Sequence, residues 1–158
     1  MNIKVLVMDV DGTLTDGKIY MGNDGEIFKV FDIKDGCGIH DILIPMGIIP
    51  MILTGRSSKT VENRCKELKI THLYQNVKDK KKKLEELIAE LDCQYSNVAY
   101  IGDDINDLAC MEQVKAAGGV IGCPYDAVEQ VRTIADFTSR KKGGDGAVRE
   151  FIEYLLRR

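Results

Sequence analysis

The 158-residue chain lacks the features that mark three large classes of protein. Its five cysteines are odd in number and scattered, and without a Cys-x-x-Cys pair we expect neither a zinc site nor a disulfide framework. No apolar run is long enough to cross a membrane, and the N-terminal residues enter a strand-like run rather than a signal peptide. The formal charge of −3 does not favour nucleic acid or anionic membranes as partners. We therefore expect a reduced, cytoplasmic protein.

The length suits one domain, here taken as residues 1–158, and no repeat, linker or low-complexity segment divides it. Short apolar runs alternate with amphipathic segments along the chain. Strands are predicted at residues 3–8, 48–53, 73–74, 98–101, 119–121 and 135–138. Helices are predicted at residues 38–46, around 61–68, and at 79–91, 105–114, 125–133 and 147–156. This alternation predicts an α/β fold with a doubly wound, mainly parallel, Rossmann-like sheet.

A β-hairpin is predicted between the first strand and the first helix, at about residues 18–31. Two strand-like runs, Lys18–Met21 and Glu26–Phe31, flank the turn sequence Gly22-Asn23-Asp24-Gly25. The second run carries apolar side chains that point to both faces, and an isolated hairpin cannot bury both. We therefore expect the hairpin to pack against other subunits.

Polar side chains recur where predicted strands end or helices begin. These groups are Asp9 and Asp11, then Thr54-Gly55-Arg56, then Lys80, and finally Asp103, Asp104 and Asp107. Parallel strands bring such positions to one edge of the sheet. Two carboxylates about 4 Å apart repel by about 4 kcal/mol at an effective dielectric of 20, so a cation is expected among them. Oxygen ligands without Cys or His indicate Mg²⁺.

Each motif also has a plainer interpretation when it stands alone. An Asp-x-Asp-Gly run often forms a turn, and Thr54-Gly55-Arg56 is typical of a helix cap. The run Lys80-Lys81-Lys82-Lys83 is typical of a solvated helix face, but cations are disfavoured at a helix N-terminus. We therefore expect at least one of these lysines to be paired with a nearby anion.

Taken together, the motifs resemble those of the haloacid dehalogenase-like phosphatases. The resemblance rests on Asp9-Val10-Asp11-Gly12-Thr13, Thr54, Lys80 and Gly102-Asp103-Asp104-x-x-Asp107, in this order. It implies that Asp9 attacks phosphorus and that Asp11 is the general acid and base. It also implies that Thr54 and Lys80 bind the phosphoryl group. Mg²⁺ would be held by Asp9, the Asp11 backbone carbonyl and Asp103, with Asp104 and Asp107 in support.

A finer resemblance covers nearly the whole chain. Residues 15–26, 35–39 and 143–150 are similar to those of the 3-deoxy-D-manno-octulosonate 8-phosphate (KDO 8-phosphate) phosphatases, which have no cap domain. This implies a homotetramer joined through its hairpins and a sugar acid phosphate as substrate. Arg56 would bind the substrate carboxylate because guanidinium matches a carboxylate bidentately, and Arg64 could help for the same reason. Gly55 is also expected among the substrate-binding residues.

Three alternatives stay open from the sequence. Related capless enzymes act on nine-carbon keto-deoxy sugar acid phosphates. Those enzymes tend to have a Glu directly after the Thr-Gly pair, whereas this chain has Arg56 there. A receiver-like signalling domain also combines an acidic cluster with a Thr and a Lys on a doubly wound sheet. A non-catalytic accessory domain of the same family is the third.

Overall fold

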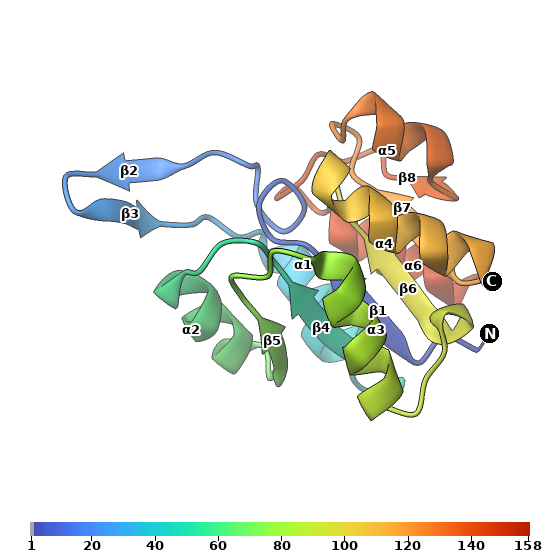
Figure 1. The fold of residues 1–158 in the computed structure, drawn as a ribbon. Coiled ribbons are helices and arrows are strands. Elements are labelled where there is room, and N and C mark those ends of the chain that lie inside the picture. The colour runs from blue at the N-terminus through green and yellow to red at the C-terminus, as the bar shows by residue number, and fades with distance from the viewer. Residues whose placement is uncertain (1) are drawn as a thin grey trace.

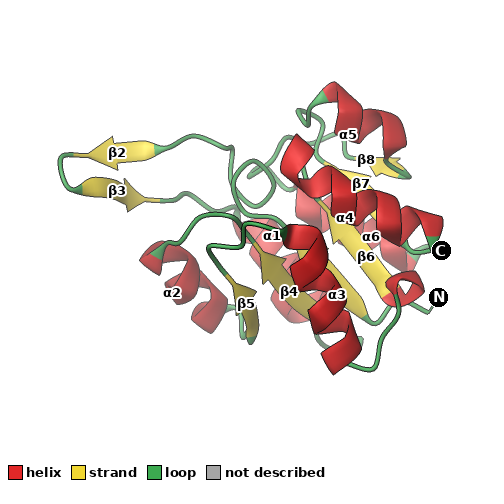
Figure 2. Ribbon diagram, in the orientation of Figure 1, coloured by secondary structure: helices red, strands yellow, loops and turns green. Residues whose placement is uncertain are grey.

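The computed structural model describes residues 2–158 and has one six-stranded parallel sheet with helices on both faces (Figures 1 and 2). The strand order is β5-β4-β1-β6-β7-β8. The strands are β1 (Val5–Met8), β4 (Ile49–Leu53), β5 (His72–Tyr74), β6 (Val98–Ile101), β7 (Val120–Cys123) and β8 (Phe137–Thr138). The predicted doubly wound α/β class is confirmed.

Two groups of helices cover the sheet, and each buries its own apolar layer. One face carries α1 (Ile33–Cys37), the π-helix Gly38–Leu43, α2 (Lys59–Glu67) and α6 (Ala147–Leu156). The other carries α3 (Lys80–Glu90), α4 (Ile105–Ala116) and α5 (Glu129–Ile134). A short 3₁₀ helix, Tyr95–Asn97, precedes β6. Alternate residues of β1 point into opposite layers, as the pleat requires, and all four are fully buried.

The predicted hairpin consists of β2 (Tyr20–Gly22) and β3 (Gly25–Phe28), joined at Asn23 and Asp24. It pairs only with itself and extends away from the body of the molecule (Figure 1). Tyr20 and Phe28 stack across it with ring centroids 4.7 Å apart. In residues 2–158 the hairpin is the one sheet-forming insertion between β1 and α1, and no cap domain lies there.

The first helical segment begins earlier than predicted, at Ile33 instead of Gly38. Asp32 caps it by accepting hydrogen bonds from the amides of Lys34 and Asp35, at 2.7 and 3.1 Å. Glycine is a poor helix former. Close packing nevertheless requires it at Gly36, because a Cβ there would lie 2.3 Å from the Arg64 guanidinium. The prediction of a helix over 38–46 was therefore wrong at its start.

The start of α5 also differs from prediction, whereas β4 includes Pro50 near its beginning. The helix predicted to begin at Tyr125 begins at Glu129, because the amide of Ala127 closes a turn onto Pro124 and that of Val128 bonds Asp103. Pro50 lies within β4 next to Leu6 of β1. Pairing of β4 with β5 starts only at Met51, so the missing amide of Pro50 leaves no ladder partner unpaired.

Candidate active site and metal centre

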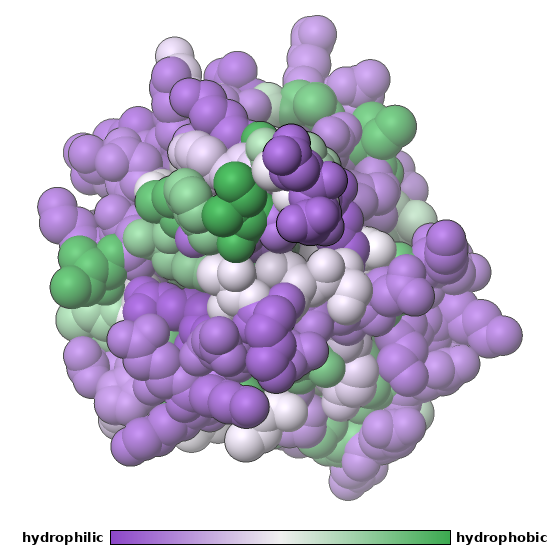
Figure 3. All heavy atoms as spheres, turned by 90° about the vertical axis from the view of Figure 1, so that its left-hand side faces the viewer, coloured by the Kyte–Doolittle hydropathy of each residue, from purple (hydrophilic) through white to green (hydrophobic). Residues whose placement is uncertain are grey.

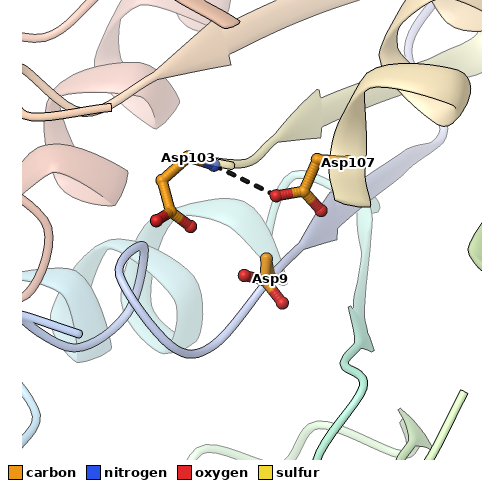
Figure 4. Close-up of side chains that lie close together, drawn as sticks. All are labelled: Asp9, Asp103 and Asp107. Atoms are coloured by element: carbon orange, nitrogen blue, oxygen red, sulfur yellow. Dashed lines mark hydrogen bonds between the residues drawn. The ribbon is translucent and has the colours of Figure 1, made fainter. Parts of the chain in front are cut away.

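Three carboxylates gather at the carboxyl edge of the sheet, where β1 and β6 end side by side (Figure 4). Asp9 follows β1 directly, Asp103 lies two residues beyond β6, and Asp107 is in the first turn of α4. One oxygen from each lies within 4.8 Å of the others. Asp9 and Asp107 are buried, and Asp103 is partly exposed. The parallel topology therefore brings together residues that are nearly a hundred positions apart, as the sequence predicted.

Lys80, the first residue of α3, reaches into the same cluster. Its Nζ donates hydrogen bonds to Asp9 Oδ1 and Asp107 Oδ1, both at 2.8 Å, and its side chain is buried. Asp79 caps the helix by accepting the amide of Lys82 at 3.0 Å, which fixes where Lys80 leaves the backbone. One of the four consecutive lysines is thus paired with anions, whereas Lys81 and Lys82 are exposed.

Asp103 is held against the loop that follows β1. Thr13 donates its hydroxyl to Asp103 Oδ1 at 2.9 Å. Gly12 has a φ of +95°, and a Cβ there would lie 2.0 Å from Asp103 Oδ2. Glycine is required at this position both by its backbone conformation and by the approach of the carboxylate.

Asp107 is engaged on both of its oxygens. Oδ1 accepts from Lys80 and from the buried hydroxyl of Tyr100, each at 2.8 Å. Oδ2 accepts from the amides of Asp103 and Asp104, at 3.1 and 3.4 Å. With four hydrogen bonds, Asp107 is fixed as a support for its neighbours, which leaves Asp9 and Asp103 as the carboxylates suited to contact an ion directly.

The electrostatics of the cluster show an excess of negative charge. Burial, reinforced by the charge of Asp107, raises the pKa of Asp9 to about 6, although Lys80 opposes the shift. Burial and the charges of Asp9 and Asp107 raise the pKa of Asp103 to about 8. Burial disfavours the charged form of Lys80, but the two carboxylates outweigh it and raise the pKa of that ammonium. One lysine thus does not balance three carboxylates, and a divalent cation with oxygen ligands fits this donor set.

A second charged group surrounds Asp11, whose carboxylate is not part of the three-carboxylate cluster. Lys29 Nζ donates to Asp11 Oδ1 at 2.5 Å and to Glu26 Oε2 at 3.0 Å. Arg56 donates to Glu26 Oε2 at 3.2 Å, and its Nε lies 4.0 Å from Asp11 Oδ2. Asp11 and Arg56, both predicted site residues, therefore lie close together.

The other predicted site residues are placed in different ways. Thr54 is buried directly after β4 at the same sheet edge, and Gly55 follows it in the exposed loop. Asp104 is exposed and caps α4, accepting the amide of Ile105 at 2.7 Å. Arg64 lies on α2, where it pairs with Glu67 at 2.8 Å and lies over the Phe31 ring. The structure does not bring Arg64 to the carboxylate cluster.

Sequence reasoning did not assign roles to Thr13, Tyr100 or Lys29. Lys29 had a usable signal, since it is the one charged residue within the apolar run Ile27–Phe31. The hydroxyls of Thr13 and Tyr100 lie in stretches typical of a turn and of a core strand, and only the tertiary structure aims them at Asp103 and Asp107.

The glycine-rich segment before α6 packs onto the loop that contains the first motif. The amide of Gly144 donates to the carbonyl of Thr13 at 3.2 Å, and that of Gly143 donates to Asp126 Oδ1 at 2.9 Å. A Cβ on Gly143 would lie 1.9 Å from the carbonyl oxygen of Gly12. This segment therefore supports the loop after β1 by direct backbone contact.

Part of the sequence matches a known protein-family model. Residues 70–152 match the family model described as haloacid dehalogenase-like hydrolase. Because the match covers more than half of the chain, the chain belongs to this class of hydrolases.

Curated and solved relatives narrow the assignment. The chain is 46% identical over 155 residues to the 3-deoxy-D-manno-octulosonate 8-phosphate phosphatase KdsC of Yersinia pestis, covering 98% of this chain and 80% of the relative. The crystal structure of the Moraxella catarrhalis phosphatase, in complex with magnesium ion, phosphate ion and KDO, superimposes with a TM-score of 0.91 at 41% identity, covering 99% of this chain and 87% of that one. A cobalt-bound Haemophilus influenzae enzyme has a TM-score of 0.91 at 33% identity, with 99% and 88% coverage. Within the hydrolases, the chain belongs to the family of KDO 8-phosphate phosphatases.

This assignment makes the chain a phosphoric monoester hydrolase by family, and it does not support the receiver-domain alternative. Across residues 2–158, no helix is both long enough and apolar enough to cross a membrane.

Proposed function

We propose that this chain hydrolyses KDO 8-phosphate to KDO and inorganic phosphate, with Mg²⁺ as its cofactor. The observation that carries the proposal is the arrangement of Asp9, which is paired with Lys80 and lies beside Asp103 in a chain that aligns with such phosphatases along nearly its whole length. Phosphoryl transfer depends mainly on positioning and on neutralising charge, and this edge of the sheet supplies both kinds of group.

In the proposed reaction, Asp9 attacks phosphorus and forms an aspartyl-phosphate while the ester oxygen leaves. Asp11 protonates that oxygen and then takes a proton from the water that hydrolyses the intermediate, a general acid and base task. Lys80, whose hydrogen bond to Asp9 aligns the nucleophile, also offers positive charge to the phosphoryl oxygens, with the hydroxyl of Thr54 as a second donor.

The ligand set proposed for Mg²⁺ is Asp9, the backbone carbonyl of Asp11, and Asp103, with Asp104 and Asp107 in support. The raised pKa values of Asp9 and Asp103 support this choice, because a cation would offset both the burial and the repulsion that raise them. When bound, Mg²⁺ supplies charge neutralisation to the phosphoryl group. Asp104 contributes through the α4 cap that it makes with Asp107.

Arg56 is proposed to bind the carboxylate of the sugar acid. Its side chain is 48% exposed and lies next to Asp11, so its free guanidinium edge is available at the site. Gly55, beside it, is proposed as a further substrate-binding residue, and a Cβ there would meet no atom nearer than the Val77 carbonyl oxygen at 3.7 Å. The curated relatives favour the eight-carbon acid over the nine-carbon acids. Arg64 stays a predicted substrate residue, and its pairing with Glu67 on α2 gives that role no support.

The deciding experiment measures phosphate release from a panel of phosphate esters, run with Mg²⁺ and with EDTA. The panel contains KDO 8-phosphate, a nine-carbon keto-deoxy acid 9-phosphate and a simple sugar phosphate. We expect KDO 8-phosphate to have the highest kcat/KM and Asp9→Asn to abolish turnover. Equal turnover of the simple sugar phosphate and KDO 8-phosphate would show that the substrate assignment is wrong. An active Asp9→Asn variant would show that Asp9 is not the nucleophile.

We further propose a cytoplasmic homotetramer in which residues 18–31 are an oligomerisation insert in one domain spanning residues 1–158. Apolar side chains of the hairpin are exposed, including Met21 at 61%, Ile27 at 63% and Val30 at 50%. Figure 3, viewed from the side to which the hairpin points, shows hydrophobic side chains among polar ones close to the viewer. The five free cysteines are consistent with a reducing compartment.

The oligomeric state is tested by sedimentation velocity on the wild type and on Ile27→Asp. A charge at this position would be buried in a hairpin interface, so we expect a tetramer for the wild type and smaller species for the variant. A Lys18→Asp variant, exposed on the same insert, should stay tetrameric. A monomeric wild type at micromolar concentration would contradict the proposal.

A further inference from the structure

Lys29 stands out among the lysines outside the carboxylate cluster because its ammonium is buried. It follows β3 at the base of the hairpin, and its side chain is only 2% exposed. Burying an ammonium costs several kcal/mol unless its charge is compensated, and here both partners are carboxylates, Asp11 and Glu26. Lys29 is thus a buried charge within the otherwise apolar run Ile27–Phe31.

Lys29 belongs to a chain of alternating charges that joins three separate segments. Asp11 comes from the loop after β1, Lys29 and Glu26 from the hairpin, and Arg56 from the loop after β4. Lys29 bridges Asp11 and Glu26, and Glu26 in turn accepts from Arg56. Burial raises the pKa of Glu26, but Lys29, Ser58 and Arg56 outweigh it and leave that pKa lowered. Glu26 is therefore a stable anion between two cations.

We propose that Lys29 is the positioning residue for Asp11, with Glu26 as its second anchor, so that the base of the hairpin is part of the active site. The proposal rests on the proposed function, in which Asp11 transfers protons. Lys29 holds Asp11 Oδ1 by a hydrogen bond, whereas the contact between Asp11 Oδ2 and Arg56 Nε is longer, at 4.0 Å. One oxygen is therefore anchored, and among the described residues the other accepts no hydrogen bond.

Such anchoring matters because proton transfer requires hydrogen-bond reach, and a misplacement of about 1 Å can cost about 100-fold in rate. Asp11 is on a loop that turns at Gly12, and its carboxylate would otherwise sample several rotamers. Lys29 contacts neither Asp9 nor Lys80 through its hydrogen bonds, so its effect on the reaction passes through Asp11.

The test compares Lys29→Met and Lys29→Arg in the wild type and in an Asp11→Asn background, with KDO 8-phosphate as substrate. We expect Lys29→Met to lower kcat about 10- to 100-fold with KM changed less than about threefold, as loss of positioned acid and base catalysis predicts. Lys29→Arg, which keeps the charge and two donors, should restore part of the loss. In the Asp11→Asn background Lys29→Met should have no further effect, because its route of action is gone.

The matched control is Lys34→Met, which removes an exposed lysine a few residues along and should leave kcat unchanged. If Lys29→Met does not fold by circular dichroism, Lys29→Gln replaces it and carries the same expectations. A wild-type kcat in Lys29→Met would overturn the positioning role. So would a decrease in kcat by the same factor in the wild-type and Asp11→Asn backgrounds. An inactive wild type would instead refute the proposed function, so the two failures are distinguishable.

Discussion

Removing the buried ammonium of Lys80 should destabilise the protein far more than removing any neighbouring lysine. Its Nζ lies 2.8 Å from an oxygen of each of Asp9 and Asp107, and at an effective dielectric of 20 each contact is worth about 6 kcal/mol before desolvation. Desolvation of the three charges offsets most of that gain, yet breaking such a pair leaves uncompensated buried carboxylates and costs about 3–5 kcal/mol. For a chain of this length the loss corresponds to a fall in Tm of about 6–20 °C.

The assay is urea unfolding of Lys80→Met beside Lys81→Met, a control that removes an exposed lysine one residue along the same helix. In EDTA at pH 8 we expect the full loss for Lys80→Met and less than about 0.5 kcal/mol for the control. At pH 5 the loss should shrink, because the buried carboxylate of Asp9, whose pKa is raised to about 6 even with Lys80 present, takes up a proton. Equal stability of the two variants at pH 8 would show that the ion pairs of Lys80 do not stabilise the fold.

Two further predictions follow from the same cluster and its support. The folded-state pKa values of Asp9 and Asp103, about 6 and 8, lie above the usual value near 4. In EDTA the free energy of unfolding should therefore fall as pH rises from 5 to 9, and saturating Mg²⁺ should reverse this fall. A free energy of unfolding that rises with pH in EDTA would contradict the prediction. Gly143→Ala places a methyl group 1.9 Å from the Gly12 carbonyl oxygen. We therefore expect urea unfolding to show a free energy of unfolding lower by more than about 2 kcal/mol, together with a reduced kcat. A wild-type unfolding curve would show that the loop adjusts freely.

Elements whose boundaries are set locally were predicted well from the sequence. The strand over 98–101 is an apolar run that ends at Gly102-Asp103, and the structure has β6 at the same residues. The last helix follows Gly146, whose φ of +99° suits glycine alone, and it runs over Ala147–Leu156 as predicted. The gathering of Asp9, Asp103 and Lys80 also follows from topology, because parallel strands end at one edge.

Features set by tertiary contact were not predictable in the same way. Asp32 caps the start of α1 locally, but the place of Gly36 within this helix depends on its packing against Arg64, a contact between residues distant in the sequence. Asp107 was expected only to support the site, and two of its four hydrogen bonds depend on where Tyr100 and Lys80 lie in space. The link from Lys29 to Asp11 joins a hairpin to a loop 18 residues away, and only the fold places them in contact.

We propose that Asp9 and Asp103 share one divalent ion at the carboxyl edge of the sheet. A crystal grown with Mn²⁺ in place of Mg²⁺ tests this most directly, since the anomalous scattering of manganese locates the ion without ambiguity. We expect a single strong anomalous peak within about 2.0–2.3 Å of a carboxylate oxygen of Asp9 and of Asp103, the range of oxygen ligands to such cations. A peak bound elsewhere, with none between these two residues at saturating Mn²⁺, would contradict it.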